Sequence, residues 1–366
     1  MLTVGVLFGG RSGEHDVSLC SAASVVSALD QKKYNVVAVG IDRDGRWYPQ
    51  ERPVIVDDKD FGRILKLEKK GDWFVNHFEE GNKLVLHNLD DKKKISVDVV
   101  FPAVHGTYCE DGTLQGLLEL TMVPYVGADS VGSSIGIDKD VSKRLLRDCG
   151  IPVVPWETVF IEDWDRGHKE ILERINTIFS LPLFVKPART GSSVGVKKVK
   201  NRSELAEAIR FAFQYDGKIL VEKGIDAREI ECSVLGNGDP KASVLGEVIS
   251  RHEFYSYESK YIDPNGAELV IPASLDAGAS DRIRDAAVKG YRALCCSGMA
   301  RVDFFLDKNT GQFYLNEINT IPGFTSISMY PKLWAYSGIE YSNLIDRLID
   351  LAIERHRARM RIRTDR

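Results

Sequence analysis

Apolar runs that alternate with amphipathic segments organise the first third of the chain. Leu2 to Phe8 is a continuous apolar run, and apolar residues then recur at helical spacing as far as Leu29. Further apolar runs span Val36 to Ile41 and Val97 to Val104. The intervening residues 43–96 are polar, and we interpret them as an inserted hairpin of little functional content. This order of strand, helix and strand predicts an N-terminal Rossmann-like α/β domain.

The rest of the chain predicts two further parts. The expected elements are strands at 183–186, 196–199, 218–223, 229–235 and 242–249, and helices at 164–178, 204–213 and 280–294. A cluster of Gly, Ser and Asp begins at Gly127, and a short connection follows Glu222. We therefore expect three domains, 1–127, 128–225 and 226–366. The fold class is α/β, with an α+β C-terminal part.

A β-hairpin near the C-terminus brings acidic residues together. Its loop is placed at 309–311, with Lys308 and Gln312 as the flanking pair. This register puts Asp303 opposite Glu317. The same count places Arg301, Asp303, Glu317 and Asn319 on one face of the hairpin, and Val302, Phe304, Tyr314 and Ile318 on the other.

Asp303 and Glu317 would repel each other in this register, because like charges directly opposite in a hairpin are destabilising. A cation between them would relieve the repulsion. Oxygen ligands from Asp303, Glu317 and Asn319 suit a hard ion such as Mg²⁺ when substrate phosphates supply the other ligands. We expect a magnesium-nucleotide site here. The alternative is a surface hairpin with solvated acids.

Two glycine-containing turns carry further candidate site residues. Backbone N–H groups of Gly191 to Gly195 could cover phosphates, and Lys186 adds positive charge beneath them. This segment is not a Walker A motif, because no Gly-Lys-Ser/Thr opens a helix. Glu14 follows the first glycine turn, where its carboxylate could bind an ammonium group. Alternatively, it only interacts with the first turn of the helix that follows. His105 follows a buried strand, where it could bind a ligand or serve the structure.

Composition excludes several classes of protein. The chain has 366 residues, 43% of them hydrophobic and 28% charged, as expected for a globular protein of two or three domains. Its net charge of -4 gives no reason to expect a nucleic-acid partner. Its six cysteines show no Cys-x-x-Cys spacing, so we expect reduced thiols. No signal peptide or membrane-length apolar run is found, so we expect a cytoplasmic protein that does not bind membranes.

A nicotinamide-dependent dehydrogenase is an alternative from a different class. The first strand, glycine turn and helix resemble part of a dinucleotide site, and Asp42 ends the next strand, where an acid could bind a ribose. The glycines do not follow the G-x-G-x-x-G order. Glu14 would also disfavour a pyrophosphate at the helix end.

Eight ordered motifs resemble those of the D-alanine:D-alanine ligase family of the ATP-grasp superfamily. They are GGRSGEHDVSL at 9–19, HGTYCEDGTLQG at 105–116, DKDVSK at 138–143, KPARTGSSVG at 186–195, EKGIDAREIE at 222–231, YSYESKY at 255–261, ARVD at 300–303 and NEINTIPGFTSIS at 316–328. The resemblance covers nearly the whole chain. It implies an ATP-grasp fold of three domains, with a Rossmann-like domain first.

The resemblance also implies roles for individual residues. It places Glu14, Ser192, Tyr261, Arg301 and Gly323 in the catalytic set. It assigns substrate binding to Glu14, His105, Arg301, Ser328 and Met329. It assigns nucleotide binding to Lys139, Lys186, Ser193, Glu222, Lys223, Ile225, Glu229 and Lys260, and metal binding to Asp303, Glu317 and Asn319. One departure is Gly224, where some relatives carry a tryptophan beside the adenine, so the wall of that pocket differs.

The implied activity is the ATP-dependent joining of two D-alanine molecules through an acylphosphate, for peptidoglycan synthesis. The implied cofactors are ATP with two Mg²⁺ or Mn²⁺ ions, and K⁺ is a further candidate. A homodimer is the expected assembly. The alternatives are a non-catalytic ATP-binding module and a D-alanine:D-lactate ligase. Relatives of the latter type carry histidine where this chain has Tyr261.

Overall fold

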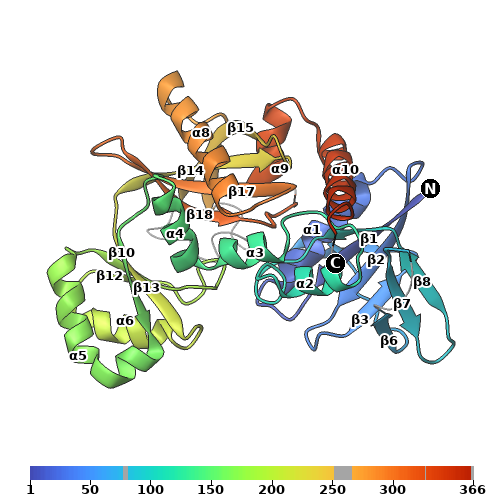
Figure 1. The fold of residues 1–366 in the computed structure, drawn as a ribbon, viewed down its shortest axis with the longest axis horizontal. Coiled ribbons are helices and arrows are strands. Elements are labelled where there is room, and N and C mark those ends of the chain that lie inside the picture. Colours follow the sequence, from blue (N-terminus) through green and yellow to red (C-terminus); the bar gives the residue numbers. More distant parts are fainter. Residues whose placement is uncertain (77–80, 251–265, 326, 364–366) are drawn as a thin grey trace.

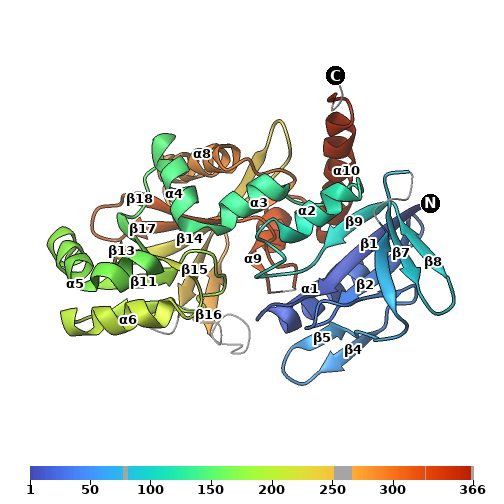
Figure 2. The ribbon, with the colours of Figure 1, turned by 60° about the horizontal axis from the view of Figure 1, so that its bottom comes forward.

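The computed structural model describes residues 1–76, 81–250, 266–325 and 327–363. Three sheets of four or five strands lie in these residues, together with two smaller sheets. Figures 1 and 2 place the N-terminal sheet at one end of the molecule and the central sheet at the other, with the C-terminal sheet next to the central one. Loops from all three therefore face a common region.

The N-terminal sheet is parallel except at one edge and has the order β3-β2-β1-β9. Its strands are β1 (Leu2–Gly9), β2 (Tyr34–Ile41), β3 (Trp47–Gln50) and β9 (Val99–Pro102), and helix α1 (His15–Ala28) follows β1. Most of β1 is buried, which explains its continuous apolar run. The predicted strand, helix and strand are confirmed, although the strand predicted at 97–104 is shorter.

Residues 43–96 form more than the single hairpin that we predicted. After β3, they contain β4 (Ile55–Asp58), β5 (Gly62–Leu65), β6 (Trp73–Asn76) and β7 (Leu84–Asn88), while β8 (Lys94–Val97) ends the segment. β4 and β5 form one small sheet, and β6, β7 and β8 form another. Strand β5 packs beside α1, and the β4–β5 turn adds Asp60 to the wall of the cavity described below.

The central sheet is antiparallel, with the order β10-β13-β11-β12. Its strands are β10 (Trp156–Phe160), β11 (Leu183–Pro187), β12 (Lys197–Val199) and β13 (Lys218–Lys223). The helices of this part are α5 (Ile161–Ile178), the short η1 (Arg202–Glu204) and α6 (Leu205–Ala212). Helix α2 (Thr113–Leu120) packs in the core of the N-terminal sheet, and α3 (Ser130–Ile137) and α4 (Lys139–Asp148) pack against the C-terminal core. Apolar residues of α5 and α6 share one core with this sheet.

The C-terminal sheet is also antiparallel, with the order β16-β15-β14-β17-β18. Its strands are β14 (Ala227–Leu235), β15 (Lys241–Ser250), β16 (Ala267–Val270), β17 (Met299–Asp307) and β18 (Phe313–Asn319). The helices are α8 (Ala277–Ala293), α9 (Met329–Tyr336) and α10 (Tyr341–Arg359). β14, β15 and α8 agree with the sequence prediction within three residues, whereas β16 was not predicted.

The β17–β18 hairpin has the predicted pairing at its acidic end but not at its turn. Asp303 pairs with Glu317, as predicted. The turn, however, is closed by a backbone bond from the Asp307 N–H to the Gln312 carbonyl, so its loop is four residues long rather than three. A β-bulge at Asn316 adds one residue to β18 and restores the predicted register beyond it.

The same bulge changes which side chains of β18 face the core. Leu315 is fully buried, whereas Tyr314 pairs with Phe305 on the cavity side of the hairpin. The prediction that Tyr314 faces the core is therefore wrong. Val302, Phe304 and Ile318 are buried as predicted.

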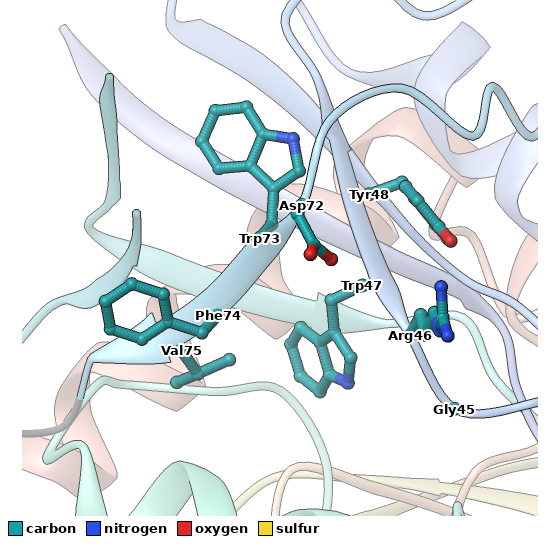
Figure 3. A pocket seen from close by; sticks show the side chains of 8 residues that line it. All are labelled: Gly45, Arg46, Trp47, Tyr48, Asp72, Trp73, Phe74 and Val75. Carbon is teal, nitrogen blue, oxygen red and sulfur yellow. The ribbon is translucent and has the colours of Figure 1, made fainter. Parts of the chain in front are cut away.

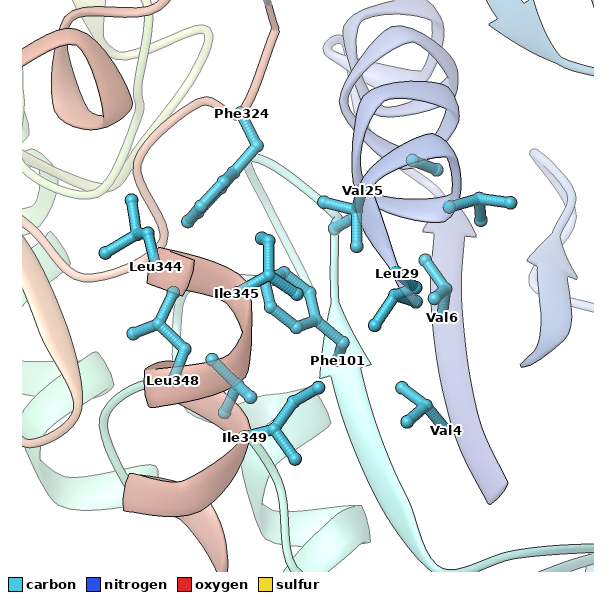
Figure 4. Close-up of a cluster of buried hydrophobic side chains, with 14 of the residues drawn as sticks. Val4, Val6, Val25, Leu29, Phe101, Phe324, Leu344, Ile345, Leu348 and Ile349 are labelled. Atoms are coloured by element: carbon cyan, nitrogen blue, oxygen red, sulfur yellow. The ribbon is translucent and has the colours of Figure 1, made fainter. Parts of the chain in front are cut away.

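Helix α10 completes the core of the N-terminal sheet. The apolar face of this helix is buried, and it packs with Val4, Val6 and Phe101 in one cluster (Figure 4). The last helix of the chain therefore stabilises the first sheet. The division into domains at 127 and 225 stays a prediction. Helix α10 belongs to the third of these domains but packs against the first.

We expect Leu348→Ala to destabilise the protein by about 2–5 kcal/mol, because Leu348 is fully buried and its loss leaves a cavity. Chemical denaturation followed by tryptophan fluorescence measures this. Glu354→Ala on the exposed side of the same helix is the matched control and should change stability by less than about 0.5 kcal/mol. Equal stability of the two variants would contradict the role of α10 in the core.

Candidate active site

A cavity of about 740 Å³ lies where loops of the three larger sheets meet. Its walls come from the segments after β1, β9 and β11 and from the C-terminal sheet. The predicted site residues that line it are Glu14, His105, Lys139, Lys186, Ser192, Ser193, Glu229, Arg301, Asp303, Glu317, Asn319, Gly323, Ser328 and Met329. The fold thus brings together residues that are distant in the sequence.

Arg301 lies on the acidic face of the hairpin as an internal counter-ion. Its Nε and Nη2 atoms each donate to Asp303 at 2.7 Å, and Nε lies 3.0 Å from Glu231 Oε2. Burial alone would lower the pKa of Arg301, but Asp303 and Glu231 outweigh burial and raise it well above its ordinary value. Part of the positive charge that we predicted between the acids is therefore supplied by the protein.

The hairpin also offers the oxygen ligands that a hard metal ion prefers. Asp303 and Glu317 are directly opposite, and Asn319 is the partner of Arg301. Two carboxylates and one amide are fewer ligands than Mg²⁺ requires, so phosphate oxygens and water would have to complete its shell. Within the described residues, no group of three or more His, Cys, Asp or Glu side chains could hold a metal ion alone. The donor set fits an ion that arrives with a phosphorylated ligand.

Glu14 joins the N-terminal sheet to the loop after β11. It is 8% exposed, and its carboxylate accepts a hydrogen bond from the Ser192 hydroxyl. A Cβ atom added at Gly106 would lie 2.7 Å from Glu14 Oε2, and one at Gly191 would lie 3.2 Å from it. Both glycines therefore allow their backbones to approach the carboxylate closely.

His105 lies in a buried network behind Glu14. Its Nε2 atom is 2.9 Å from Ser21 Oγ, and Nδ1 is 3.7 Å from Glu110 Oε1. Burial alone would lower the pKa of His105, but Glu110 outweighs burial and raises it. The raised pKa favours the protonated form of His105 beside Glu14 and Glu110, and this form suits the carboxylate end of a zwitterionic ligand.

Two predicted phosphate-binding lysines lie below the loop after β11. Lys139 Nζ donates to the Thr190 carbonyl at 2.6 Å, and Lys186 Nζ lies 2.6 Å from Glu222 Oε2. Lys186 also lies over the rings of Phe184 and Phe305, at 5.9 and 5.8 Å from their centroids. Both ammonium groups are therefore held in fixed positions at the cavity wall.

Some predicted site residues lie away from the cavity wall or outside the described chain. Glu222 is 2% exposed, and its carboxylate is enclosed by lysines instead of lining the cavity. Lys223 and Ile225, at the end of β13, do not line it either. Lys260 and Tyr261 lie outside the described residues.

The structure adds residues that sequence reasoning missed. Asn316 lines the cavity because the bulge turns it there, and Glu231 lines it beside Arg301. Lys143 is buried against Glu222 at 3.1 Å. Glu231 and Lys143 both lie inside the motifs that carry the resemblance, but a motif does not reveal which charges pair.

Asp42 does not have the surroundings that a ribose-binding acid needs. It is 3% exposed and accepts hydrogen bonds from the backbone N–H groups of Asp44 and Arg46, at 2.9 and 3.0 Å. Lys69 Nζ also lies 3.1 Å from its carboxylate. Asp42 therefore stabilises its own turn, which removes the main support for a dehydrogenase.

A second cavity of about 360 Å³ lies between the β2–β3 turn and β6 (Figure 3). Trp47, Trp73 and Phe74 form much of its wall, with Arg46 and Asp72 at its edge. It includes none of the predicted site residues. The larger cavity, which contains the acids and lysines, is the candidate active site.

Comparison with known proteins identifies the family of this chain. The family model described as D-ala D-ala ligase N-terminus matches residues 3–128, and the one described as D-ala D-ala ligase C-terminus matches residues 145–350. The chain belongs to the D-alanine:D-alanine ligase family. D-alanine–D-alanine ligase A of Salmonella typhimurium is 45% identical to this ligase over 363 residues, which are 99% of each chain.

Two solved structures are also similar to this ligase. The D-alanine-D-alanine ligase from Coxiella burnetii is 37% identical, with a TM-score of 0.80, over 99% of this chain and 98% of that chain. The VanG D-Ala:D-Ser ligase from Enterococcus faecalis is 34% identical, with a TM-score of 0.80, over 96% of this chain and 99% of that chain. This ligase has the ATP-grasp fold, which confirms the predicted fold class.

Membership of the family settles the broad chemistry. This protein is an ADP-forming ligase that uses ATP and a divalent metal ion and acts on small molecules. The dehydrogenase alternative is therefore wrong. Along the described chain, no helix is both long enough and apolar enough to span a bilayer.

We expect Ser192→Ala to speed amide hydrogen exchange about five- to tenfold in residues 190–195 of the unliganded protein. The hydroxyl bond to Glu14 ties this loop to the N-terminal sheet, and a bond of this kind contributes about 1 kcal/mol. Exchange followed by mass spectrometry measures the effect. Ser203→Ala, on an exposed turn of the same part, is the control and should leave residues 190–195 unchanged. Unchanged exchange in Ser192→Ala would show that the bond does not restrain the loop.

Proposed function

We propose that this ligase joins two D-alanine molecules to form D-alanyl-D-alanine, with conversion of ATP to ADP and phosphate, and so supplies a precursor of peptidoglycan. One observation carries the proposal. A single cavity combines a carboxylate that suits an ammonium, lysines that suit phosphates and an acidic hairpin that suits a metal ion. A non-catalytic nucleotide-binding module would need the lysines and the hairpin but not Glu14 or Arg301.

The first D-alanine is proposed to bind between Glu14 and His105. Glu14 accepts hydrogen bonds from the ammonium group, and His105, made more basic by Glu110, attracts the carboxylate. The carboxylate then attacks the γ-phosphate of ATP, which forms an acylphosphate and releases ADP. Closure by Ser192 and Tyr261 excludes water, which would otherwise hydrolyse this intermediate.

The nucleotide is proposed to lie between the central and C-terminal sheets. Its phosphates are held by Lys139, Lys186, Lys260 and the Ser193 segment, and its ribose by Glu229. Because Glu222, Lys223 and Ile225 do not line the cavity, we propose no direct contact between them and the nucleotide. Asp303, Glu317 and Asn319 would hold two Mg²⁺ or Mn²⁺ ions, which when bound offset the negative charge of the phosphates.

The second D-alanine is proposed to bind near Gly323, Ser328 and Met329. A Cβ atom added at Gly323 would lie 2.7 Å from Ser328 Oγ, so a side chain there would obstruct the site. The amine of the second D-alanine attacks the acylphosphate carbon, loses a proton and displaces phosphate. Arg301 and the backbone near Gly323 stabilise the tetrahedral oxyanion before phosphate leaves.

The choice of D-alanine as second substrate rests on Tyr261. A histidine at this position could be cationic near neutral pH and attract a lactate carboxylate, whereas a tyrosine is neutral there. The similarity to a D-Ala:D-Ser ligase makes D-serine the second competitor to test. We further propose a cytoplasmic homodimer. Stimulation by K⁺ is a separate possibility to be tested by replacing it with Na⁺.

The direct test is release of phosphate from ATP by the purified protein in the presence and absence of D-alanine. We expect release that depends on D-alanine, with D-alanyl-D-alanine as the main product by mass spectrometry. A mixture with D-lactate or D-serine at neutral pH should still give mainly the D-alanine dipeptide. Phosphate release that ignores D-alanine would reject the ligase activity, and mainly ester or D-serine product would reject only the specificity.

We expect Glu317→Gln to reduce turnover by at least about a hundredfold while changing metal-free stability little. The substitution removes a metal ligand, but it also removes one of two facing carboxylates and so relieves repulsion. Steady-state assays and thermal melts without metal measure the two effects. Asp307→Asn, near the turn of the same hairpin and away from the cavity, is the control for a change of charge. Normal turnover combined with a large loss of stability in Glu317→Gln would mean that the hairpin acids are structural.

A further inference from the structure

Lys143 is a buried cation that the proposed mechanism does not use. It lies on α4, is 1% exposed and does not line the active-site cavity. Its Nζ atom lies 3.1 Å from Glu222 Oε1 and 3.3 Å from the Val154 carbonyl, and 5.6 Å from the centre of the Trp156 ring. Lysine is among the residues least often fully buried, because removing its charge from water is costly. An apolar residue would fill this position at lower cost, so the charge itself calls for an explanation.

Glu222 connects Lys143 to the cavity. Its Oε1 atom faces Lys143, and its Oε2 atom faces Lys186 at 2.6 Å. Although burial alone would raise the pKa of Glu222, the two lysines hold it at about 2, so the carboxylate is ionised. Lys186 does line the cavity. Glu222 and Lys186 therefore link Lys143 to the cavity by ion pairs.

We infer that Lys143 is a positioning residue that shares the counter-ion of Lys186 and thereby leaves the charge of Lys186 available to the nucleotide phosphates. Glu222 alone would neutralise Lys186, since the two would form a closed ion pair. With Lys143 added, the three groups carry one net positive charge, and only Lys186 is placed to present it to the cavity. Glu222, which pairs with both lysines, also holds Lys186 over the rings of Phe184 and Phe305.

This inference rests on the proposed role of Lys186 at the phosphates, and it predicts an unusual pattern of rescue. Lys143→Met lowers the net charge of the group to zero. Glu222→Gln added to it restores one positive charge while retaining the side-chain shape. If Lys143 and Glu222 only support the fold, two buried substitutions together should be at least as harmful as one.

The test measures the affinity of the purified full-length protein for ATP with Mg²⁺, and for adenosine, by calorimetry. We expect Lys143→Met to weaken ATP binding about tenfold, the loss of about one charge-assisted bond, and to leave adenosine binding within about twofold. Lys143→Met/Glu222→Gln should return ATP affinity to within about threefold of the wild type. Lys169→Met, an exposed lysine on α5, controls for loss of a remote charge and should have no effect.

Two outcomes would overturn the inference: equal weakening of ATP and adenosine in Lys143→Met, or a double variant that binds ATP no better than the single one. If Lys143→Met does not fold, Glu222→Gln decides the question, because its extra positive charge should leave ATP binding at least as tight as in the wild type. Weaker binding of ATP by Glu222→Gln would also overturn the inference. Failure of the proposed function is seen separately, as absence of D-alanine-dependent phosphate release by the wild type.

Discussion

Repulsion between like charges at one cavity is the constraint on which the rest of this structure depends. Asp303 and Glu317 face each other across the hairpin, and Lys143 and Lys186 share one carboxylate. Such groups repel each other more strongly away from water. In each case a group of opposite charge lies beside them: Arg301 pairs with Asp303, and Glu222 pairs with both lysines. Each of these charges is therefore held beside a like charge by a partner of the opposite sign.

The fold places these groups on rigid elements. The acids lie on paired strands, Glu222 lies on a strand with neighbours on both sides, and Lys143 lies on a helix that packs against the C-terminal core. The loop after β11 differs, because Ser192 and Ser193 both have positive φ angles, which are unfavourable for side-chain-bearing residues. The charged groups are thus held on strands and a helix, while the loop that covers them has a less favourable backbone conformation. This combination suits a site that must admit a nucleotide and then exclude water.

The sequence predicted the strands well where burial on both faces gives a continuous apolar run, as in β1 and β2. It also predicted that Asp303 pairs with Glu317, but through two errors that cancelled. The loop is one residue longer than expected, and the bulge at Asn316 offsets this. Apolar periodicity alone could not show either feature, since each shifts the pattern by a single residue.

Other features of the site depend on contacts between distant segments. Nothing local to Lys143, Glu222 or Glu231 indicates which charge each one meets, because their partners lie on other elements. Helix α10 likewise has a clear apolar face, but its sequence does not show that this face covers the N-terminal sheet. The site residues could be named by resemblance to a family. Their ion pairs could not, because pairing is set by the assembly of all three sheets.

The central claim is that the acidic hairpin holds metal ions together with the nucleotide phosphates. The most direct measurement is a crystal structure of the protein with Mn²⁺ and a non-hydrolysable ATP analogue, with anomalous diffraction used to locate the manganese. We predict anomalous peaks within bonding distance of Asp303, Glu317 and Asn319, with Arg301 moved away from at least one oxygen of Asp303. Bound nucleotide without manganese at these residues, and with the Arg301–Asp303 pair unchanged, would contradict the account.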